Sequence, residues 1–327
     1  MKNRIIATFF SAAAMFLASS AYGQWAPVGP VELIVAAGSG GGNDRTARLL
    51  ANMLTGAKLV QAPVVVVNKP GAGGVIAQNY LNSHRGNGHY LMITNPALLT
   101  NPIIGVGTAK YTEVTPVAQL FNEYVLLVAK SSAKVETGKD LIASWKRSPT
   151  SLSLAVAPGL GAGPHIAAAM VAQTAGVDPS KLVVVPYVTA AAALTALLGG
   201  HVDLMASTTM NVLPFLVSGK VHALGITGPQ RIPGQLASVP TWREQGVDVE
   251  FGNWRGVVGP DGMTKAQITY WEGVFSKLVA LPEWKARVDE EFSQGDYKDS
   301  AASKLFLDQE NQRLGQLLKR LGLATSK

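Results

Sequence analysis

The chain has 327 residues, a formal net charge of +7, 47% hydrophobic residues and no cysteine. This composition excludes an intrinsically disordered protein and supplies apolar material for two cores of ordinary domain size. The lack of cysteine excludes disulfides, a thiolate nucleophile, zinc knuckles and iron–sulfur clusters.

Histidine spacing and the distribution of basic residues narrow the possible functions further. The five histidines show neither an HExxH pattern nor tight ligand spacing, so we expect no catalytic metal and no cofactor. Basic residues are scattered along the chain rather than gathered in runs with aromatic residues, which argues against a nucleic-acid partner. A modest positive charge instead favours small anionic ligands.

The first 23 residues predict export. Lys2 and Arg4 form a short positive region, residues 5–18 are mostly apolar, and Ala21-Tyr22-Gly23 is a small-x-small cleavage site. The apolar run is shorter than the roughly 20 residues that a membrane span needs. We therefore expect residues 1–23 to be a secretory signal peptide, removed to leave a soluble, exported protein.

After Trp25 the chain alternates apolar runs typical of strands with helical patterns, which predicts a largely parallel α/β fold. The first series predicts strands at 31–36, 64–67 and 90–94 and helices at 44–54 and 75–81. A second series predicts strands at 124–129, 151–155, 182–185, 202–206 and 221–226, with helices at 165–173 and 190–198. The run 249–258 is followed by three helical patterns, and the last, 303–321, has an amphipathic leucine face.

The two α/β series are not separated by a proline-rich linker, so the chain is expected to cross between two lobes on strands. Candidate crossings lie near residues 124–129 and 251–258. This places residues 24–124 and 251–327 in lobe 1, and residues 125–250 in lobe 2.

A strand, a glycine-rich turn and a helix follow one another in three places: Gly38–Asp44, Asn68–Gly74 and Pro158–His165. Glycine allows positive φ and close approach of the backbone to a ligand, and a helix start offers unpaired N–H groups. One such loop is weak evidence. Three of them at corresponding positions of two lobes predict an anion site, because ligands bind at the carboxyl ends of strands in open α/β sheets.

Two enzyme classes compete with a binding protein. The first loop has Asn43 where a dinucleotide fingerprint has its third glycine, and no P-loop lysine follows any loop. No G-x-S-x-G elbow is present. His165 could act as a base, but no acidic residue nearby in sequence orients it. We therefore predict no enzyme activity, with an exported hydrolase or lyase as the alternative from another class.

The ordered set of motifs resembles the extracytoplasmic solute receptors of the tripartite tricarboxylate transporters, the Bug family. The resemblance covers essentially the whole mature chain. Its carriers are Gly40–Arg48, Asn68–Gly74, Gly159–His165, Ala193–Asp203, and Ser218–Lys220 with Ala223-Leu224.

This resemblance implies a two-lobed periplasmic binding protein of type II, a Venus flytrap whose lobes are joined by two crossing strands. It implies a small carboxylate as ligand, bound between the lobes and delivered to membrane permease subunits of a tripartite tricarboxylate transporter. A ligand sensor that reports to a signalling partner is the alternative among binding proteins.

The resemblance also implies the contact residues. In lobe 1 they are Ser39, Gly40, Gly41, Asn43, Asp44, Gly73, Gly74, Thr94 and Asn95. In lobe 2 they are Gly161, Gly163, His165, Tyr187, Thr189, Ser207 and Thr208. Many relatives have Tyr-Lys-Gly where this chain has Tyr187-Val188-Thr189. The missing lysine favours a ligand with one carboxylate and a less charged or aromatic body over a tricarboxylate.

Three further residues have expected roles near these loops. Trp254 and Arg255 lie on the second crossing strand, where we expect Trp254 to be packed and Arg255 to be solvated. Arg45 lies one helical turn from Arg48 and could face the cleft.

Overall fold

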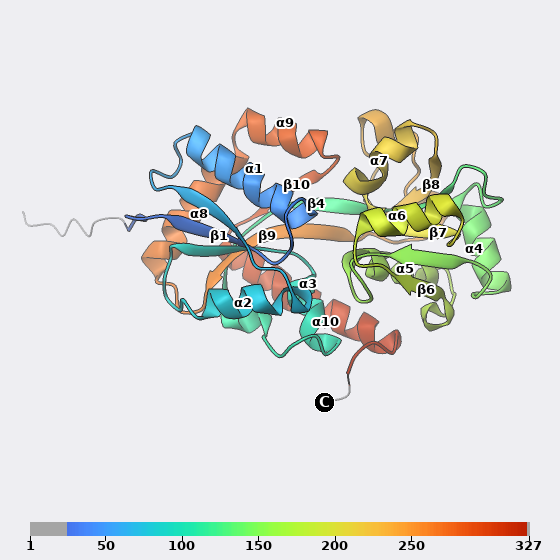
Figure 1. Cartoon of the computed structure of the whole chain (residues 1–327), viewed down its shortest axis with the longest axis horizontal. Coiled ribbons are helices and arrows are strands. Elements are labelled where there is room, and N and C mark those ends of the chain that lie inside the picture. Colours follow the sequence, from blue (N-terminus) through green and yellow to red (C-terminus); the bar gives the residue numbers. More distant parts are fainter. Residues whose placement is uncertain (1–24, 326–327) are drawn as a thin grey trace, which may run out of the picture.

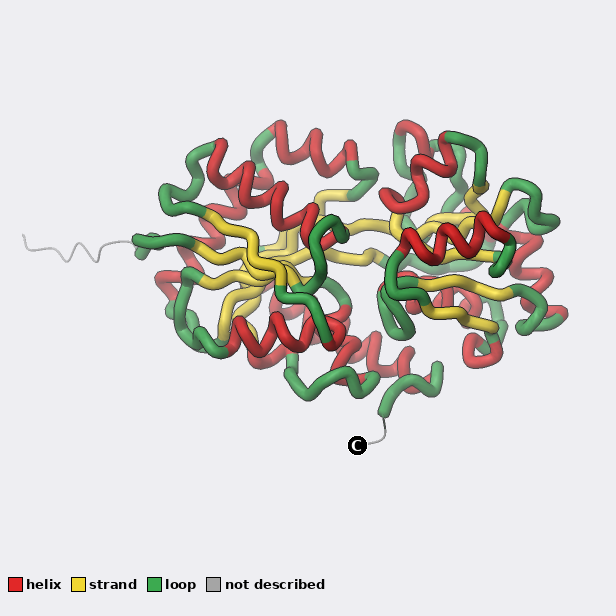
Figure 2. The backbone as a smooth tube through the Cα atoms, viewed as in Figure 1, coloured by secondary structure: helices red, strands yellow, loops and turns green. Residues whose placement is uncertain are grey.

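A computed structural model describes residues 25–325, so the signal peptide predicted for residues 1–23 lies outside the described residues. The strands of the described part form one ten-stranded network. Figure 1 shows that this network is divided into two halves, each with helices on both faces of its strands. Figure 2 shows long strands running between the halves.

The central strands of the first half bury apolar side chains on both faces of its sheet. The strand order is β2 (Val64–Asn68), β1 (Val31–Val35), β3 (Tyr90–Thr94), β9 (Gly252–Pro260), the first part of β4 (Val114–Lys130) and β10 (Gln294–Lys298). One face packs against α1 (Gly42–Gly56), α8 (Lys265–Val279) and α9 (Pro282–Glu290). The other packs against α2 (Val75–Asn82), α3 (Ala97–Ile103) and α10 (Ser300–Arg320).

The second half repeats this plan with shorter strands. Their order is β6 (Val183–Pro186), β5 (Ser153–Val156), β7 (Leu204–Thr208), the last part of β4 and β8 (Val221–Ile226). The helices α4 (Gly138–Arg147) and α5 (Gly163–Thr174) pack on one face, and α6 (Ala190–Gly199) and α7 (Thr209–Val217) on the other.

Strands β4 and β9 connect the halves. Tyr124 of β4 still pairs with Gly252 of β9, whereas the next residue, Val125, pairs with Thr208 of β7. β9 enters from the second half through Phe251, whose N–H donates to Thr227 O at 3.0 Å. The predicted pair of crossing strands is therefore present.

The late helices agree with the sequence pattern. Three helices follow β9 in the part of the chain up to residue 325, and the predicted leucine face of the last is buried: Leu307, Leu314, Leu317, Leu318 and Leu321 are between 0% and 7% exposed. Trp254 is packed as expected, at 2% exposed.

Other elements differ from the sequence pattern, and three of them have a local reason. β4 begins at Val114 rather than at Tyr124, because a register shift after Pro116 accommodates a residue that strands normally exclude. α3 and α7 each contain a proline, which disfavours helix in a short window. The short strand β10 and the helix α4 were also not predicted.

Candidate ligand-binding cleft

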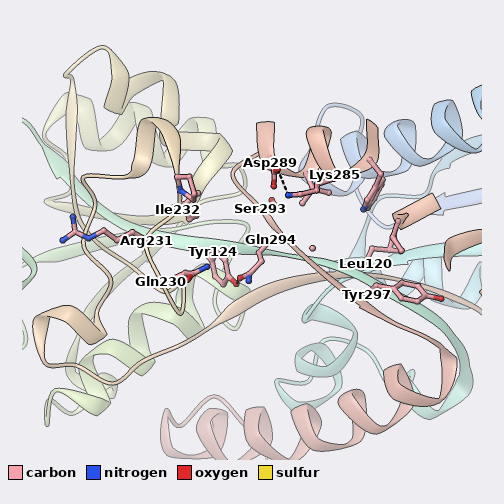
Figure 3. A pocket seen from close by; sticks show the side chains of 15 residues that line it. Leu120, Tyr124, Gln230, Arg231, Ile232, Lys285, Asp289, Ser293, Gln294 and Tyr297 are labelled. Atoms are coloured by element: carbon pink, nitrogen blue, oxygen red, sulfur yellow. Dashed lines mark hydrogen bonds and ion pairs between the residues drawn. The ribbon is translucent and has the colours of Figure 1, made fainter. Parts of the chain in front are cut away.

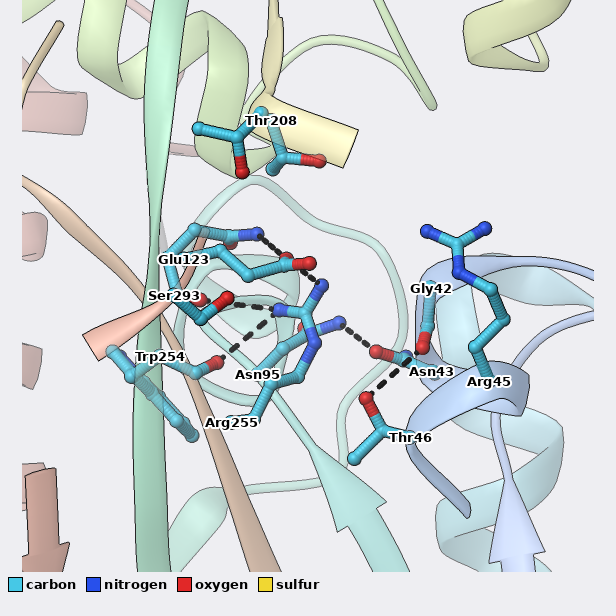
Figure 4. Close-up of polar contacts among 12 residues, drawn as sticks. Gly42, Asn43, Arg45, Thr46, Asn95, Glu123, Thr208, Trp254, Arg255 and Ser293 are labelled. Carbon is cyan, nitrogen blue, oxygen red and sulfur yellow. Dashed lines mark hydrogen bonds and ion pairs between the residues drawn. The ribbon is translucent and has the colours of Figure 1, made fainter. Parts of the chain in front are cut away.

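The starts of helices from both halves meet at strand β9. A Cβ placed on Gly42, the first residue of α1, would lie 3.2 Å from Arg255 Nη2. A Cβ placed on Gly163, the first residue of α5, would lie 2.5 Å from Asn253 Oδ1. A side chain at Gly163 would therefore collide with Asn253 and one at Gly42 would press against the Arg255 guanidinium, so glycine at both positions lets the helix starts approach the side chains of β9 closely. Figure 4 shows this region.

A buried ion pair forms the floor between these helix starts. Arg255 Nη2 donates to Glu123 Oε2, and the two residues are 5% and 3% exposed. Arg255 Nη1 also donates to the carbonyl oxygens of Asn253 and Trp254, at 3.2 and 3.3 Å, and Asn253 Nδ2 donates to Glu123 Oε2 at 3.2 Å. The expectation that Arg255 is solvated was wrong. Its partner is 132 positions away, and pairing makes burial of the guanidinium tolerable.

The first-lobe loop is held together by Asp44, which is 2% exposed. Asp44 accepts hydrogen bonds from Gly40 N at 2.8 Å, Arg48 Nε at 2.9 Å and Asn68 Nδ2 at 2.9 Å. Hydrogen bonding from Arg48 above all, with help from Gly40 and Asn68, lowers the pKa of Asp44 to about 2. Its carboxylate is thus occupied by its own loop, while Ser39 and Gly40 lie exposed beside it.

We expect Asp44→Asn to lower the free energy of unfolding by about 1 kcal/mol at pH 7, since the pair with exposed Arg48 is partly screened. Because folding lowers the pKa from 3.8, this contribution is complete above about pH 3.8 and is lost as the pH falls toward 2. Urea unfolding of both proteins at pH 7 and pH 2.5 measures it. If the difference in free energy of unfolding between wild type and Asp44→Asn is the same at both pH values, the lowered pKa of Asp44 is contradicted.

Asn43 and Asn95 link the start of α1 to the end of β3. Asn95 Nδ2 donates to Asn43 Oδ1 at 3.1 Å, and Asn95 Oδ1 accepts from Ala97 N at 2.8 Å. This orients the Asn43 amide, and no hydrogen bond among residues 25–325 uses its Nδ2. Gly41, the N-cap of α1, has no capping side chain. The start of α1 therefore presents hydrogen-bond donors.

The remaining first-lobe candidates shape the loops. Thr94 is buried at the end of β3. Gly73 and Gly74 have φ of 63° and 110°, which favours glycine at both positions. Asn101 Nδ2 donates to Gly73 O at 2.7 Å and fixes this turn against α3.

His165 closes the glycine loop of the second lobe. Gly161 N donates to His165 Nδ1 at 2.9 Å, and the imidazole is 5% exposed. Burial lowers the pKa of His165 to about 4, so the ring is neutral near pH 7 and can accept this bond. The Gly161 N–H is therefore used within the loop, whereas Gly163 lies against Asn253.

The other second-lobe candidates divide into two groups. Thr189 Oγ1 caps α6 by accepting from Ala192 N at 3.1 Å, and Tyr187 follows the edge strand β6. Ser207 and Thr208 are buried at the end of β7, where Asn211 Nδ2 donates to both hydroxyl oxygens, at 3.2 and 3.1 Å. In Figure 4 the Thr208 hydroxyl points toward Glu123.

Comparison with known proteins decides the family. The model described as "Tripartite tricarboxylate transporter family receptor" matches residues 46–323. The chain belongs to this family. A protein encoded in the gbd 5' region of Cupriavidus necator is 27% identical over 91% of this chain and 89% of its own length. Protein BugT of Bordetella pertussis is 28% identical over 72% of both chains.

Solved structures agree with this receptor in fold. The periplasmic binding protein BugD is 28% identical, with a TM-score of 0.77 over 92% of this chain and all of its own. MatC from Rhodopseudomonas palustris, solved with bound malate, is 25% identical, with a TM-score of 0.76 over 89% and 99%. An R. palustris protein solved with adipate is 26% identical, with a TM-score of 0.80 over 91% and 99%.

Membership confirms the predicted two-lobed binding-protein fold and the prediction that this receptor is not an enzyme. Between residues 25 and 325 no helix has both the length and the apolar character needed to cross a membrane. In the same part of the chain, no three acidic or histidine side chains come together as metal ligands.

The receptor also has a groove of about 510 Å³ that none of the predicted site residues lines. Its walls come from β4, α9, β10 and the loop after β8, and Tyr124, Ile232, Lys285 and Gln294 are among its lining residues (Figure 3). The volume falls in the range of small-molecule pockets. Its basic lining residues Arg231 and Lys285 are paired with Glu244 and Asp289, respectively.

Sequence reasoning missed three polar residues that contact the candidate site residues: Glu123, Asn253 and Asn211. Asn211 could have been found, since an asparagine in the first turn of a helix after a Ser-Thr strand end is a local signal. Glu123 and Asn253 had no such signal, because their importance comes from the pairing of β4 with β9.

Proposed function

We propose that this receptor binds a small carboxylate between its lobes and delivers it to the membrane subunits of a tripartite tricarboxylate transporter. The supporting observation is the meeting of α1 and α5 at Arg255 and Asn253 of the crossing strand. Helix starts bind carboxylates through their N–H groups and the positive end of the helix dipole. Among relatives, MatC was solved with malate and another protein with adipate.

Within this proposal the candidate residues have different tasks. The backbone at Gly41 and Gly42, the Asn43 amide and the Thr208 hydroxyl supply donors to the ligand. Asp44 acts through its loop, as do His165 and Thr189, because their polar atoms are occupied by backbone N–H groups. The ligand is a mono- or dicarboxylate, aromatic acids included.

Closure of the lobes on the ligand follows from contacts to both of them. We take residues 24–124 with 251–327 and residues 125–250 as the two moving units. A ligand that contacts only one unit would not favour the closed form, because a ligand shifts an equilibrium only by its difference in affinity. We place the mature receptor in the periplasm after removal of residues 1–23.

We expect a cognate acid to raise the thermal unfolding midpoint of the mature protein, beginning at Gln24. A ligand at about 100 times its dissociation constant adds roughly 2.7 kcal/mol to the free energy of unfolding. The panel contains citrate, dicarboxylates, acidic amino acids, and benzoate- and phthalate-type acids. Differential scanning calorimetry of protein refolded to remove carried-over ligand is the measurement.

The matched variants are Asn43→Ala, which removes a donor in the cleft, and Asn79→Ala, which changes an exposed asparagine of α2. Asn43→Ala should reduce the ligand-induced shift, and Asn79→Ala should retain it. A protein whose midpoint is unchanged by every acid would contradict the proposed function.

A further inference from the structure

Glu123 places a carboxylate among hydrogen-bond donors at the floor of the cleft. Its Oε2 accepts from Arg255 Nη2 and Asn253 Nδ2. No hydrogen bond in the described part of the chain uses its Oε1, and this oxygen retains accessible surface although the side chain is only 4% exposed. Figure 4 shows the carboxylate between Arg255 and the Thr208 hydroxyl.

The two groups that hold Glu123 also contact both lobes. Arg255 lies against Gly42 at the start of α1, and Asn253 lies against Gly163 at the start of α5. A ligand bound by the helix starts of both lobes would therefore lie next to the two residues that hold Glu123. The Oε1 atom offers such a ligand a charged acceptor in a site otherwise rich in donors.

Pairing with Glu123 also removes the positive charge that Arg255 would otherwise offer. The buried pair is neutral, so the floor does not attract a second ligand carboxylate. The negative charge is felt nearby: burial first, and then the charge of Glu123, raise the pKa of Glu291 at the end of α9, against the opposing effect of Arg45, Arg287 and Arg255. The pair has no net charge, but Oε1 is its negative end, so a second ligand carboxylate in contact with Oε1 would meet like charge.

We propose that Glu123 is a specificity-determining residue of this receptor. It accepts a hydrogen bond from a hydroxyl or ammonium group on the body of the ligand, and it selects monocarboxylates with such a donor against dicarboxylates of the same length. A charge-assisted hydrogen bond stabilises the first class, and repulsion disfavours the second. The inference rests on the proposed carboxylate function.

Two matched ligand sets test the selection. Hexanoate, 6-hydroxyhexanoate and adipate share a six-carbon chain, and benzoate, 4-hydroxybenzoate and terephthalate share a ring. Isothermal titration calorimetry on the wild-type receptor should rank the hydroxy acid of at least one set tightest and the diacid of that set weakest.

The variant Glu123→Gln should change this ranking. Two donors hold Oε2, so the glutamine oxygen is expected to stay there and its NH2 group to replace Oε1. The affinity for the diacid relative to the hydroxy acid should rise by roughly tenfold or more, as expected when one charged contact is reversed. Glu136→Gln, an exposed position outside the cleft, makes the same change in net charge and should leave the ratio unchanged.

The outcomes separate this inference from the proposed function. A wild-type receptor that binds the diacid most tightly, or a Glu123→Gln variant with an unchanged ratio, would overturn the selection and leave the carboxylate receptor intact. Failure of the wild-type protein to bind any acid of the two sets or of the wider panel would overturn the function, and the selection with it. If Glu123→Gln does not fold, the wild-type ranking decides alone.

Discussion

Replacing Arg255 by methionine is expected to lower the free energy of unfolding by about 3–5 kcal/mol. The change leaves the Glu123 carboxylate buried without its charged partner, where Asn253 alone donates to it. It also removes the two hydrogen bonds from Arg255 to the carbonyl oxygens of Asn253 and Trp254. Urea unfolding followed by circular dichroism measures the loss.

A double variant distinguishes loss of pairing from loss of packing. Glu123→Met together with Arg255→Met replaces the buried pair by apolar side chains, and such replacements are often close to neutral. We expect the double variant to be more stable than Arg255→Met alone. Arg243→Met, which breaks an exposed pair with Asp248 and Glu250, should have little effect. If the double variant loses as much free energy of unfolding as Glu123→Met and Arg255→Met lose together, Glu123 and Arg255 are not coupled.

The second large effect is a pH-dependent loss of stability caused by His165. The folded protein binds a proton at this ring only near pH 4, whereas the unfolded chain binds it near pH 6.5. The contribution of the neutral imidazole to the free energy of unfolding is therefore complete above about pH 6.5. It is lost as the pH falls from about 6.5 to about 4. The expected loss is about 2–3 kcal/mol.

His165→Asn isolates this titration. Asparagine can accept from Gly161 N through Oδ1 but does not titrate, so the difference in stability between wild type and variant should shift in favour of the variant as the pH falls from 7 to 4. His201→Asn, at an exposed position, should follow the wild-type profile. The measurement is the urea midpoint at half-unit pH intervals, and parallel profiles for wild type and His165→Asn would contradict a buried neutral imidazole.

Short stretches of sequence determined much of this fold. Strands β1, β3 and β8 and helices α1, α5 and α10 agree with the predicted segments to within a few residues, because hydrophobic period and turn chemistry are encoded in windows of 5–20 residues. The glycine loops were found for the same reason. Positive φ at Gly40, Gly73, Gly74 and Gly161 is a local requirement that leaves a visible residue type.

Tertiary structure decided which polar groups are hydrogen-bonded within the protein and which keep unused donors or acceptors. Asp44 and His165 look like site residues in the sequence, yet both accept hydrogen bonds from their own loops. Glu123 and Arg255 look like surface charges, yet strand pairing buries them together between the starts of α1 and α5. The physical reason is distance along the chain. Local backbone preference is set by neighbouring residues, whereas the cost of burying a charge is set by a partner that only the folded chain brings near.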